Sequence, residues 1–248
     1  PPRSTLFPYT TLFRSQLPAV HSRELVSILK KVAEAPRKLS DLSGRYTSLE
    51  MWDETGARKD GTLRRQTCFV ASTSNFVLSG PHIFSGNPLS KTPRAICTQK
   101  GHYDSLDLLW LPNEYLPRTN YVSACDDGTQ FARTPTVSWL SKSDPQRVTE
   151  FYRVVVRAMI SIGAEKALVS AICPKGVGHI NGIRSFVFAN SADLIEFAGL
   201  TFSLVFDFLM KISGRTNLHQ SLDDYPFPES LLCDSRLGAR VLGLTALT

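Results

Sequence analysis

The hydrophobic pattern near the start of the chain predicts an amphipathic helix. In residues 22–33 the apolar positions recur every three or four residues, which brings them to one helical face. Ser22 is placed to cap the amino end of this helix, because its hydroxyl accepts hydrogen bonds from the first free backbone N–H groups. Pro36 follows and interrupts helical hydrogen bonding. We therefore expect one helix over residues 22–33 that ends before Pro36.

Short apolar runs then predict strands that are separated by polar and irregular segments. Strands are expected at residues 68–71, 76–78 and 83–84, and the polar run 53–61 predicts a solvated turn between two short strands. Residues 79–121 are rich in proline, glycine and asparagine, yet they also carry many aromatic and basic side chains. That mixture favours an ordered loop surface over disorder.

The central part of the chain predicts a helix followed by two strands. Asp144 is a candidate cap and Pro145 suits the first helical turn, and the apolar spacing that follows predicts a helix that ends at Gly163. Strands are expected at residues 166–173 and 184–189. The glycine-rich run 174–182 between them is interpreted as a flexible connection, because it satisfies no nucleotide-binding pattern and leads into a strand.

The most apolar stretch of the chain, residues 191–213, predicts a buried core helix with Gly214 as its carboxyl cap. It contains Glu196 and Asp207 and is too short for a membrane span, which needs about twenty mostly apolar residues. Residues 239–248 are typical of a further helix. The predicted fold class is therefore α+β, with small mixed sheets and packed helices.

Composition and charge narrow the function classes only slightly. The net charge is +6 and the isoelectric point is about 9.2, which fits a polyanionic partner without requiring one. The five cysteines are widely spaced, so no zinc-binding or C-x-x-C motif occurs, and an odd, scattered set is typical of reduced thiols in the cytoplasm. We expect a cytoplasmic protein with no membrane contact.

No complete catalytic motif is present. Asn87-Pro88-Leu89-Ser90 begins like the Asn-Pro-Pro-aromatic signature of amino-methyltransferases, but the second proline and the aromatic residue are missing, so we interpret it as a turn. The sequence has no Walker A motif, no G-x-S-x-G, no H-E-x-x-H and no convincing nuclease arrangement of acids and a lysine. We therefore predict no catalytic, cofactor-binding or metal-binding residues in this chain.

The two ends of the chain are expected to lie outside the main domain. Residues 1–15 (PPRSTLFPYTTLFRS) resemble a translated sequencing adapter, and a natural disordered tail is the alternative. We predict a linker and the start of a recognition region over residues 16–75, a recognition domain over 76–228, and the start of a truncated following segment over 229–248.

Several segments resemble one family when they are taken in order. Residues 76–98 (FVLSGPHIFSGNPLSKTPRAICT) and 116–121 (LPRTNY) resemble the C-terminal region of type IIG-like restriction–modification methylases, which are adenine-specific and carry a TaqI-like specificity domain. Residues 151–174 resemble the part of that domain where a helix ends and a strand runs to a proline, and 204–228 resemble its closing helix and Pro-x-Pro loop. The resemblance covers residues 49–228.

The chain departs from the family's pattern at two places. Lys166-Ala167 stands where relatives commonly carry an Arg-Thr pair, and Ser90 stands where relatives tend to have an aromatic residue. Contacts that the family makes with the Arg-Thr pair are therefore not carried over to this chain.

The resemblance implies a division of labour within a larger enzyme. A methyltransferase core outside this chain would bind S-adenosylmethionine and methylate a flipped adenine, while this segment would bind double-stranded DNA and recognise its sequence. The predicted DNA contacts are basic or imidazole side chains in loops and turns of the recognition region: Lys91, Arg94, Arg118, Lys175, His179 and Arg215.

Two other functions stay open at this stage. The chain is alternatively an interaction module that docks a separate methylase or nuclease subunit, with its aromatic loops as a protein interface. A third interpretation is a non-functional fragment. Binding that weakens steeply with salt would favour DNA recognition over the interaction module.

Overall fold

The structure is a computed structural model of the 248-residue chain. The structure describes residues 23–84, 91–99, 101–107, 109–112, 114–140, 143, 145–218, 222–227 and 235–245. Several predictions lie outside these residues: the tail 1–15, the caps at Ser22 and Asp144, and the turn 87–90. Residues 228–234, around the predicted boundary at residue 229, also lie outside them.

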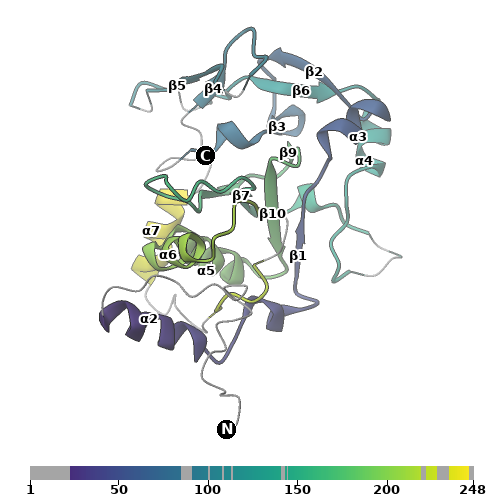
Figure 1. Cartoon of the computed structure of the whole chain (residues 1–248). Coiled ribbons are helices and arrows are strands. Elements are labelled where there is room, and N and C mark those ends of the chain that lie inside the picture. Colours follow the sequence, from purple (N-terminus) through teal and green to yellow (C-terminus); the bar gives the residue numbers. More distant parts are fainter. Residues whose placement is uncertain are drawn as a thin grey trace.

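A four-stranded antiparallel sheet forms the centre of the molecule (Figure 1). Its strands are β1 (Tyr46–Leu49), β10 (Ile183–Phe188), β7 (Arg153–Arg157) and β8 (Ser170–Cys173), in that spatial order. The mixture of small sheets and helices confirms the predicted α+β class. Strands were expected where β8 and β10 lie, although β8 is shorter than predicted.

The predicted helix after Asp144 is wrong, because its apolar residues form strand β7. Only a single 3₁₀ turn, η4 (Val148–Glu150), precedes the strand. Val154, Val155 and Val156 follow one another, and β-branched side chains favour an extended backbone. All three are completely buried, with Val154 and Val156 on one face of the sheet and Val155 on the other. Burial on both faces gives a continuous apolar run that also matches helical spacing.

Helices cover one face of the central sheet (Figure 1). They are α5 (Ser191–Phe202), α6 (Leu204–Ile212) and α7 (Ser235–Thr245), while α2 (Arg23–Ala33) adds Leu29 and Val32 at the edge of the same core. The core places Phe197 of α5 against Phe186 and Phe188 of β10, with ring centroids 4.8 and 5.3 Å apart. The amphipathic helix predicted from residues 22–33 is thus confirmed over residues 23–33.

The predicted core helix over residues 191–213 is present but divided in two. Ser203 ends α5 and caps α6, because its backbone is extended and its hydroxyl accepts from the backbone N–H of Phe206. Gly214 ends α6 with a φ of 65°, as the prediction of a glycine cap requires. The acidic Asp207 is buried in α6 and accepts from the backbone N–H groups of Ala167 and Leu168.

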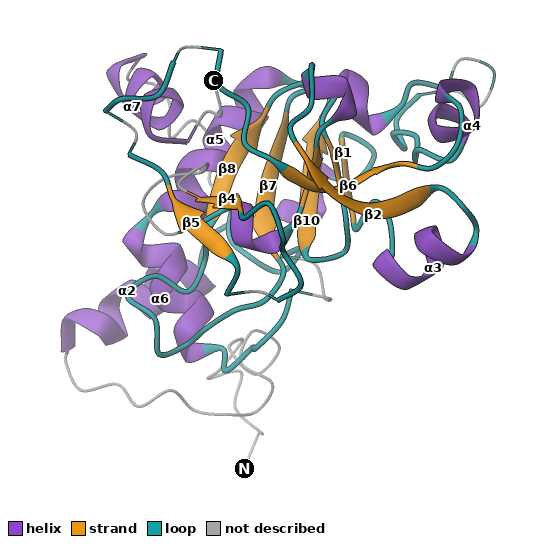
Figure 2. Ribbon diagram, turned by 90° about the horizontal axis from the view of Figure 1, so that it is seen from above, coloured by secondary structure: helices purple, strands orange, loops and turns teal. Residues whose placement is uncertain are grey.

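Small β-elements cover the opposite face of the sheet. The ribbon of β2 (Leu63–Cys68) and β6 (Thr119–Ser123) is antiparallel, as is the hairpin of β4 (Lys91–Pro93) and β5 (Tyr103–Ser105). The short strands β3 (Val77–Leu78) and β9 (Gly178–His179) pair in parallel. Seen from above, the ribbon crosses the central strands (Figure 2). Leu63, Tyr121 and Val187 meet in the core beneath it.

Short helical elements join these strands. They are α3 (Glu54–Lys59), α4 (Asp127–Ala132) and the 3₁₀ turns η1 (Leu39–Leu42), η2 (Thr73–Asn75) and η3 (Gly80–His82). The segment 53–61 does lie between two strands, β1 and β2, but it forms helix α3 instead of a simple turn. Asp53 caps that helix by accepting from the backbone N–H of Gly56 at 2.7 Å.

Two segments near opposite ends of the described chain, residues 37–40 and 223–227, are joined by backbone hydrogen bonds. The backbone N–H groups of Leu39 and Ser40 donate to Tyr225 and Asp223, and that of Phe227 donates to Arg37. Residues before and after position 75 also share the central sheet and the core under the ribbon. Segments on both sides of residue 75 thus contribute to one sheet and one core.

Within the described part of the chain, none of the helices combines the length and the apolar character that crossing a membrane requires.

Candidate nucleic-acid interface and adjoining pocket

Three of the predicted DNA-contact residues come together around strand β4. Lys91 begins the strand and Arg94 follows it. Arg118 comes from the residue before β6, and its backbone N–H donates to the Thr92 hydroxyl at 3.0 Å while its guanidinium donates to the Pro93 carbonyl at 3.4 Å. The fold thus gathers cations that are separated in the sequence. We call Lys91, Arg94 and Arg118 the β4 cluster.

Aromatic rings hold two of these cations in place. The Lys91 ammonium lies 3.9 Å from the centre of the Phe84 ring, and the Arg118 guanidinium lies 4.4 Å from that of Phe69. Phe69 and Phe84 are themselves exposed, and Tyr115 meets Phe69 edge-on. Each such contact contributes about 0.5–1 kcal/mol at an exposed site. The side chains are therefore ordered at the surface and do not extend freely into solvent.

Arg94 is paired with an acid on the neighbouring strand. Its Nε atom lies 2.8 Å from a carboxylate oxygen of Asp104 in β5, and both side chains are more than half exposed. An exposed pair of this kind is weak and is exchanged readily for another anion. Arg94 can therefore reach a phosphate if Asp104 is displaced.

Buried polar groups support the hairpin from beneath. His82 is fully buried, and its ring bonds to the hydroxyl of Ser79 at 3.0 Å and to the backbone carbonyl of Arg118 at 2.9 Å. Burial lowers the pKa of His82 to about 4, so the ring is neutral. The Tyr103 hydroxyl bonds to Ser79 at 2.8 Å and accepts from Asn120 at 2.7 Å, and burial raises the pKa of Tyr103 to about 12. This network fixes β5 and β6 relative to η3.

A pocket of about 410 Å³ opens beside the β4 cluster. Exposed Thr98 and Gln99, which follow β4, lie at its rim. Its wall includes Arg65 of β2, which donates from Nη2 to the Cys97 carbonyl at 2.9 Å. Tyr121 of β6 donates to a carboxylate oxygen of Glu54 at 2.6 Å inside the pocket, and burial raises the pKa of this tyrosine.

The remaining predicted contacts do not join the β4 cluster. Lys175 is exposed, but its ammonium lies over the ring of Tyr152, 5.5 Å from the ring centre. The guanidinium of Arg215 lies over the Tyr225 ring at 5.7 Å, on the helical side of the sheet. Of the six predicted DNA-contact residues, the structure therefore brings three together in the β4 cluster. The other three lie at separate places.

The predicted phosphate contact of His179 requires correction. This histidine is completely buried in β9, where its ring bonds to the Ser185 hydroxyl at 2.8 Å and to the Ile180 carbonyl at 3.1 Å. Burial and the nearby charge of Arg153 lower its pKa to about 3, so the ring is uncharged. The surrounding run 174–182 is also not a flexible connection, because β9 pairs with β3 and lies within the core.

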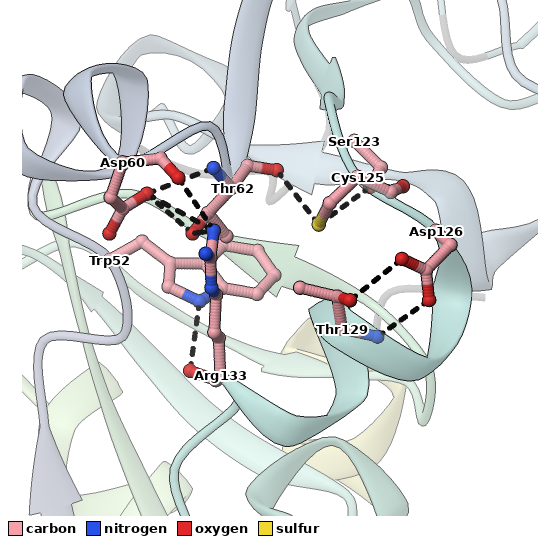
Figure 3. Close-up of polar contacts among 8 residues, drawn as sticks. All are labelled: Trp52, Asp60, Thr62, Ser123, Cys125, Asp126, Thr129 and Arg133. Atoms are coloured by element: carbon pink, nitrogen blue, oxygen red, sulfur yellow. Dashed lines mark hydrogen bonds and ion pairs between the residues drawn. The ribbon is translucent and has the colours of Figure 1, made fainter.

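A polar cluster fixes the far end of the β2–β6 ribbon (Figure 3). Arg133 donates to the backbone carbonyl of Asp60 at 2.9 Å and to the Thr62 hydroxyl at 2.8 Å. Thr62 also donates to the Asp60 carboxylate, and these hydrogen bonds lower the pKa of Asp60. On the same side, the Trp52 indole donates to the Arg133 carbonyl at 3.4 Å. The cluster holds α3, β2 and α4 together and so positions the ribbon.

Sequence reasoning missed the pocket because its residues are dispersed. Its polar members come from many separate strands, helices and loops, among them α3, β2, β5, β6, β7 and the segment after α6, and no short motif joins them. The one local signal is Asn120, an amide between the buried Thr119 and Tyr121. In the described ranges, no cluster of three or more histidine, cysteine or acidic side chains is arranged to hold a metal ion.

Comparison with known proteins does not identify this fold or site: no protein-family model matches the chain, and no significant match to it was found among curated proteins.

Proposed function

We propose that this chain is the DNA target-recognition segment of an S-adenosylmethionine-dependent, adenine-specific DNA methyltransferase of a restriction–modification system. The observation that carries the proposal is the β4 cluster, in which Lys91, Arg94 and Arg118 lie around one short strand with exposed aromatic rings among them. The resemblance of residues 49–228 to TaqI-like specificity regions supports it.

The chemistry of the β4 cluster suits a nucleic-acid backbone. Lysine and arginine neutralise phosphates and release condensed counterions, which provides affinity that does not depend on sequence. Arginine in addition reads guanine in the major groove by donating two hydrogen bonds to one base edge. Exposed Phe69 and Phe84 add apolar surface for sugars or bases next to those charges.

Catalysis is assigned to a methyltransferase core elsewhere in the parent enzyme. That core would bind S-adenosylmethionine, which supplies the methyl group, and this chain would hold the duplex against it. Free cysteines at positions 68, 97, 125 and 173 are consistent with the reducing cytoplasm in which such enzymes meet DNA.

Duplex binding at two salt concentrations tests the proposal. Fluorescence anisotropy with a labelled random-sequence duplex is expected to show affinity that falls steeply as salt rises. Lys91→Ala should weaken binding to all sequences alike and reduce the salt slope by about one counterion. The matched control is Lys30→Ala, which removes one exposed lysine from α2, at the end of the molecule opposite β4 (Figure 1). Equal effects of the two variants would contradict the role of the β4 cluster.

A second function, docking of a separate methylase or nuclease subunit, is favoured by a different observation. Ile96, Leu109 and Trp110 are large apolar side chains with 79–88% of their surface exposed. Exposed apolar groups of this kind are typical of protein interfaces. Absence of duplex binding at low salt, together with complex formation with a purified methylase core that Trp110→Ala abolishes, would support this alternative.

A further inference from the structure

The pocket beside the β4 cluster has the form of a ligand site. Its volume of about 410 Å³ falls at the small end of the range of about 300–1,000 Å³ that is typical of small-molecule sites. The rim at Thr98 and Gln99 is exposed, whereas Ser79, Gly80 and Asn120 on its inner wall are buried. A ligand of the size of one nucleoside can thus enter from the surface and lose most of its contact with water.

Several polar groups in this pocket lack partners within the protein. The side-chain carbonyl oxygen of Asn217 is buried and makes no hydrogen bond. Glu54 uses one carboxylate oxygen to accept from Tyr121, and its second oxygen has no hydrogen-bond partner among the described residues. The Arg157 guanidinium likewise makes no side-chain hydrogen bond within the described ranges. A buried polar atom without a partner is costly, so the Asn217 oxygen indicates a polar ligand. Glu54 and Arg157 are partly exposed and leave further hydrogen-bonding groups for that ligand.

Apolar groups form the rest of the wall. Met159, Ile180 and Pro81 contribute flat or compact apolar surface, and the ring of Tyr103 lies among them in the lining. A planar heterocycle is the ligand that matches this combination, because its faces pack against apolar groups while its edge makes hydrogen bonds.

We propose that this pocket binds one nucleobase that has left the stack of the bound DNA, and that the preferred base carries an exocyclic amino group. The proposal rests on the proposed function, since the base would come from the duplex held at the β4 cluster. Glu54 and Asn217 offer oxygen acceptors to the amino group, and Arg157 offers donors to a ring nitrogen or carbonyl. Thymine has no exocyclic amine and is the poorest match.

The pocket shares the β4–β5 hairpin with the β4 cluster. Thr98 and Gln99 follow Arg94 in the loop between β4 and β5, and Asn120 is two residues after Arg118, on the same side of β6. The rim of the pocket is thus close along the chain to the residues that would hold the duplex. Holding such a base would pin the bound duplex at one nucleotide.

Bulged duplexes provide a direct test. The probes are one random-sequence duplex and the same duplex with a single extra cytosine or a single extra thymine, because a bulged base needs little energy to leave the stack. We expect the cytosine bulge to bind about tenfold more tightly than the intact duplex, which corresponds to about 1.4 kcal/mol, and the thymine bulge to gain less. A bulged 2-aminopurine should change its fluorescence on binding.

Two variants assign the effect to the pocket. Gln99→Trp places a large ring at the exposed rim and should abolish the ratio between bulged and intact affinities, whereas Ser43→Trp, at an exposed turn before β1, should leave that ratio unchanged. Glu54→Gln keeps an acceptor for Tyr121 but replaces the other acceptor with a donor, so it should shift the preference from cytosine toward thymine.

The outcomes separate this inference from the proposed function. If intact and bulged duplexes bind equally and Gln99→Trp changes nothing, the pocket does not take a base and the β4 cluster alone explains DNA binding. If neither duplex binds at low salt, the proposed function is wrong, and this inference is wrong with it.

Discussion

At the scale of single residues, the contact between Gly178 and Trp52 fixes strand β9 in the core. A Cβ atom at position 178 would lie 2.4 Å from the Trp52 ring, far inside van der Waals contact. The indole is buried and belongs to the core beneath the β2–β6 ribbon. The absence of a side chain at Gly178 therefore allows β9 to pair with β3 directly beside this ring.

We expect Gly178→Ala to destabilise the protein. The added methyl group must displace the Trp52 ring, and overpacking of this kind costs about 1–3 kcal/mol. Chemical denaturation measures the loss. Gly163→Ala is the matched control, because a Cβ there meets nothing within 4 Å, and its change should stay within about 0.5 kcal/mol. Equal losses in the two variants would contradict the packing argument.

Arg153 is a buried cation whose hydrogen bonding is incomplete. Its side chain is completely buried on β7 and donates to the Val177 carbonyl, with Cys173 Sγ at 3.8 Å. The Nε and Nη1 atoms have no hydrogen-bond partner. Burial lowers the pKa of this guanidinium, because a cation in the core loses its hydration.

Replacing this cation should not destabilise the fold. We expect Arg153→Met to leave the free energy of unfolding unchanged or to raise it by up to about 3 kcal/mol, because an apolar chain of similar length removes an incompletely paired charge. The same variant should raise the pKa of His179, which the Arg153 charge lowers. As a contrast, Arg184→Met removes an arginine that donates to Ser48 and lies 3.8 Å from Glu50, and it should lose about 1 kcal/mol. A clear loss for Arg153→Met would contradict the interpretation.

At the scale of elements, the β4–β5 hairpin combines attraction and repulsion for a nucleic acid. Asp104 places a carboxylate next to Arg94 on the neighbouring strand. We expect Asp104→Asn to strengthen duplex binding about two- to fivefold at low salt, because it frees Arg94 and removes a negative charge from the binding face. Glu165→Gln is the charge-matched control, an exposed acid in the loop between β7 and β8. Weaker binding by Asp104→Asn would show that the ion pair orients Arg94 for contact.

Sequence patterns predicted some elements closely and assigned others to the wrong type. Helix α2 and strand β10 match their predicted segments closely. Strand β7 was predicted as a helix, because burial of both its faces removes the alternation that identifies a strand. The division between α5 and α6 depends on the backbone at Ser203, where an extended conformation interrupts an otherwise apolar helical run.

The candidate site was predictable in part for a similar reason. The basic, aromatic segment identified Lys91, Arg94 and Arg118, which the fold brings to one strand. His179 looked equally available in the sequence, yet its pairing with β3 buries it. The pocket could not be predicted, because Glu54, Arg157 and Asn217 meet only through the long-range packing of the ribbon on the sheet.

At the scale of the whole molecule, the buried histidines make stability depend on pH. Burial lowers the pKa of His82 to about 4 and that of His179 to about 3, from an ordinary value of 6.5. Both rings are neutral when folded, whereas the unfolded chain takes up protons as the pH falls below 6.5. The stability that the neutral rings contribute is therefore complete above pH 6.5, and it is lost as the pH falls toward about 4 for His82 and about 3 for His179.

Denaturation at neutral pH and at about pH 5 measures this loss, which we expect to be on the order of 2 kcal/mol for each histidine at the lower pH. Imidazole ¹⁵N spectra provide the site-specific check. The His82 and His179 rings should remain neutral at about pH 5, and a ring that titrates near its ordinary value would contradict the buried, neutral assignment.

The contact between residues 37–40 and 223–227 has a consequence for how the protein is made. The ribosome synthesises residues 37–40 long before residues 223–227, so these segments can pair only late in translation. Strand β1 is likewise made long before its partner β10. The nascent polypeptide therefore presents an unpaired sheet edge and uncovered apolar rings throughout most of translation, a condition that invites aggregation and chaperone binding. Closure involves contacts between distant parts of the sequence, so folding should be slow and should begin only after nearly the entire described chain has emerged.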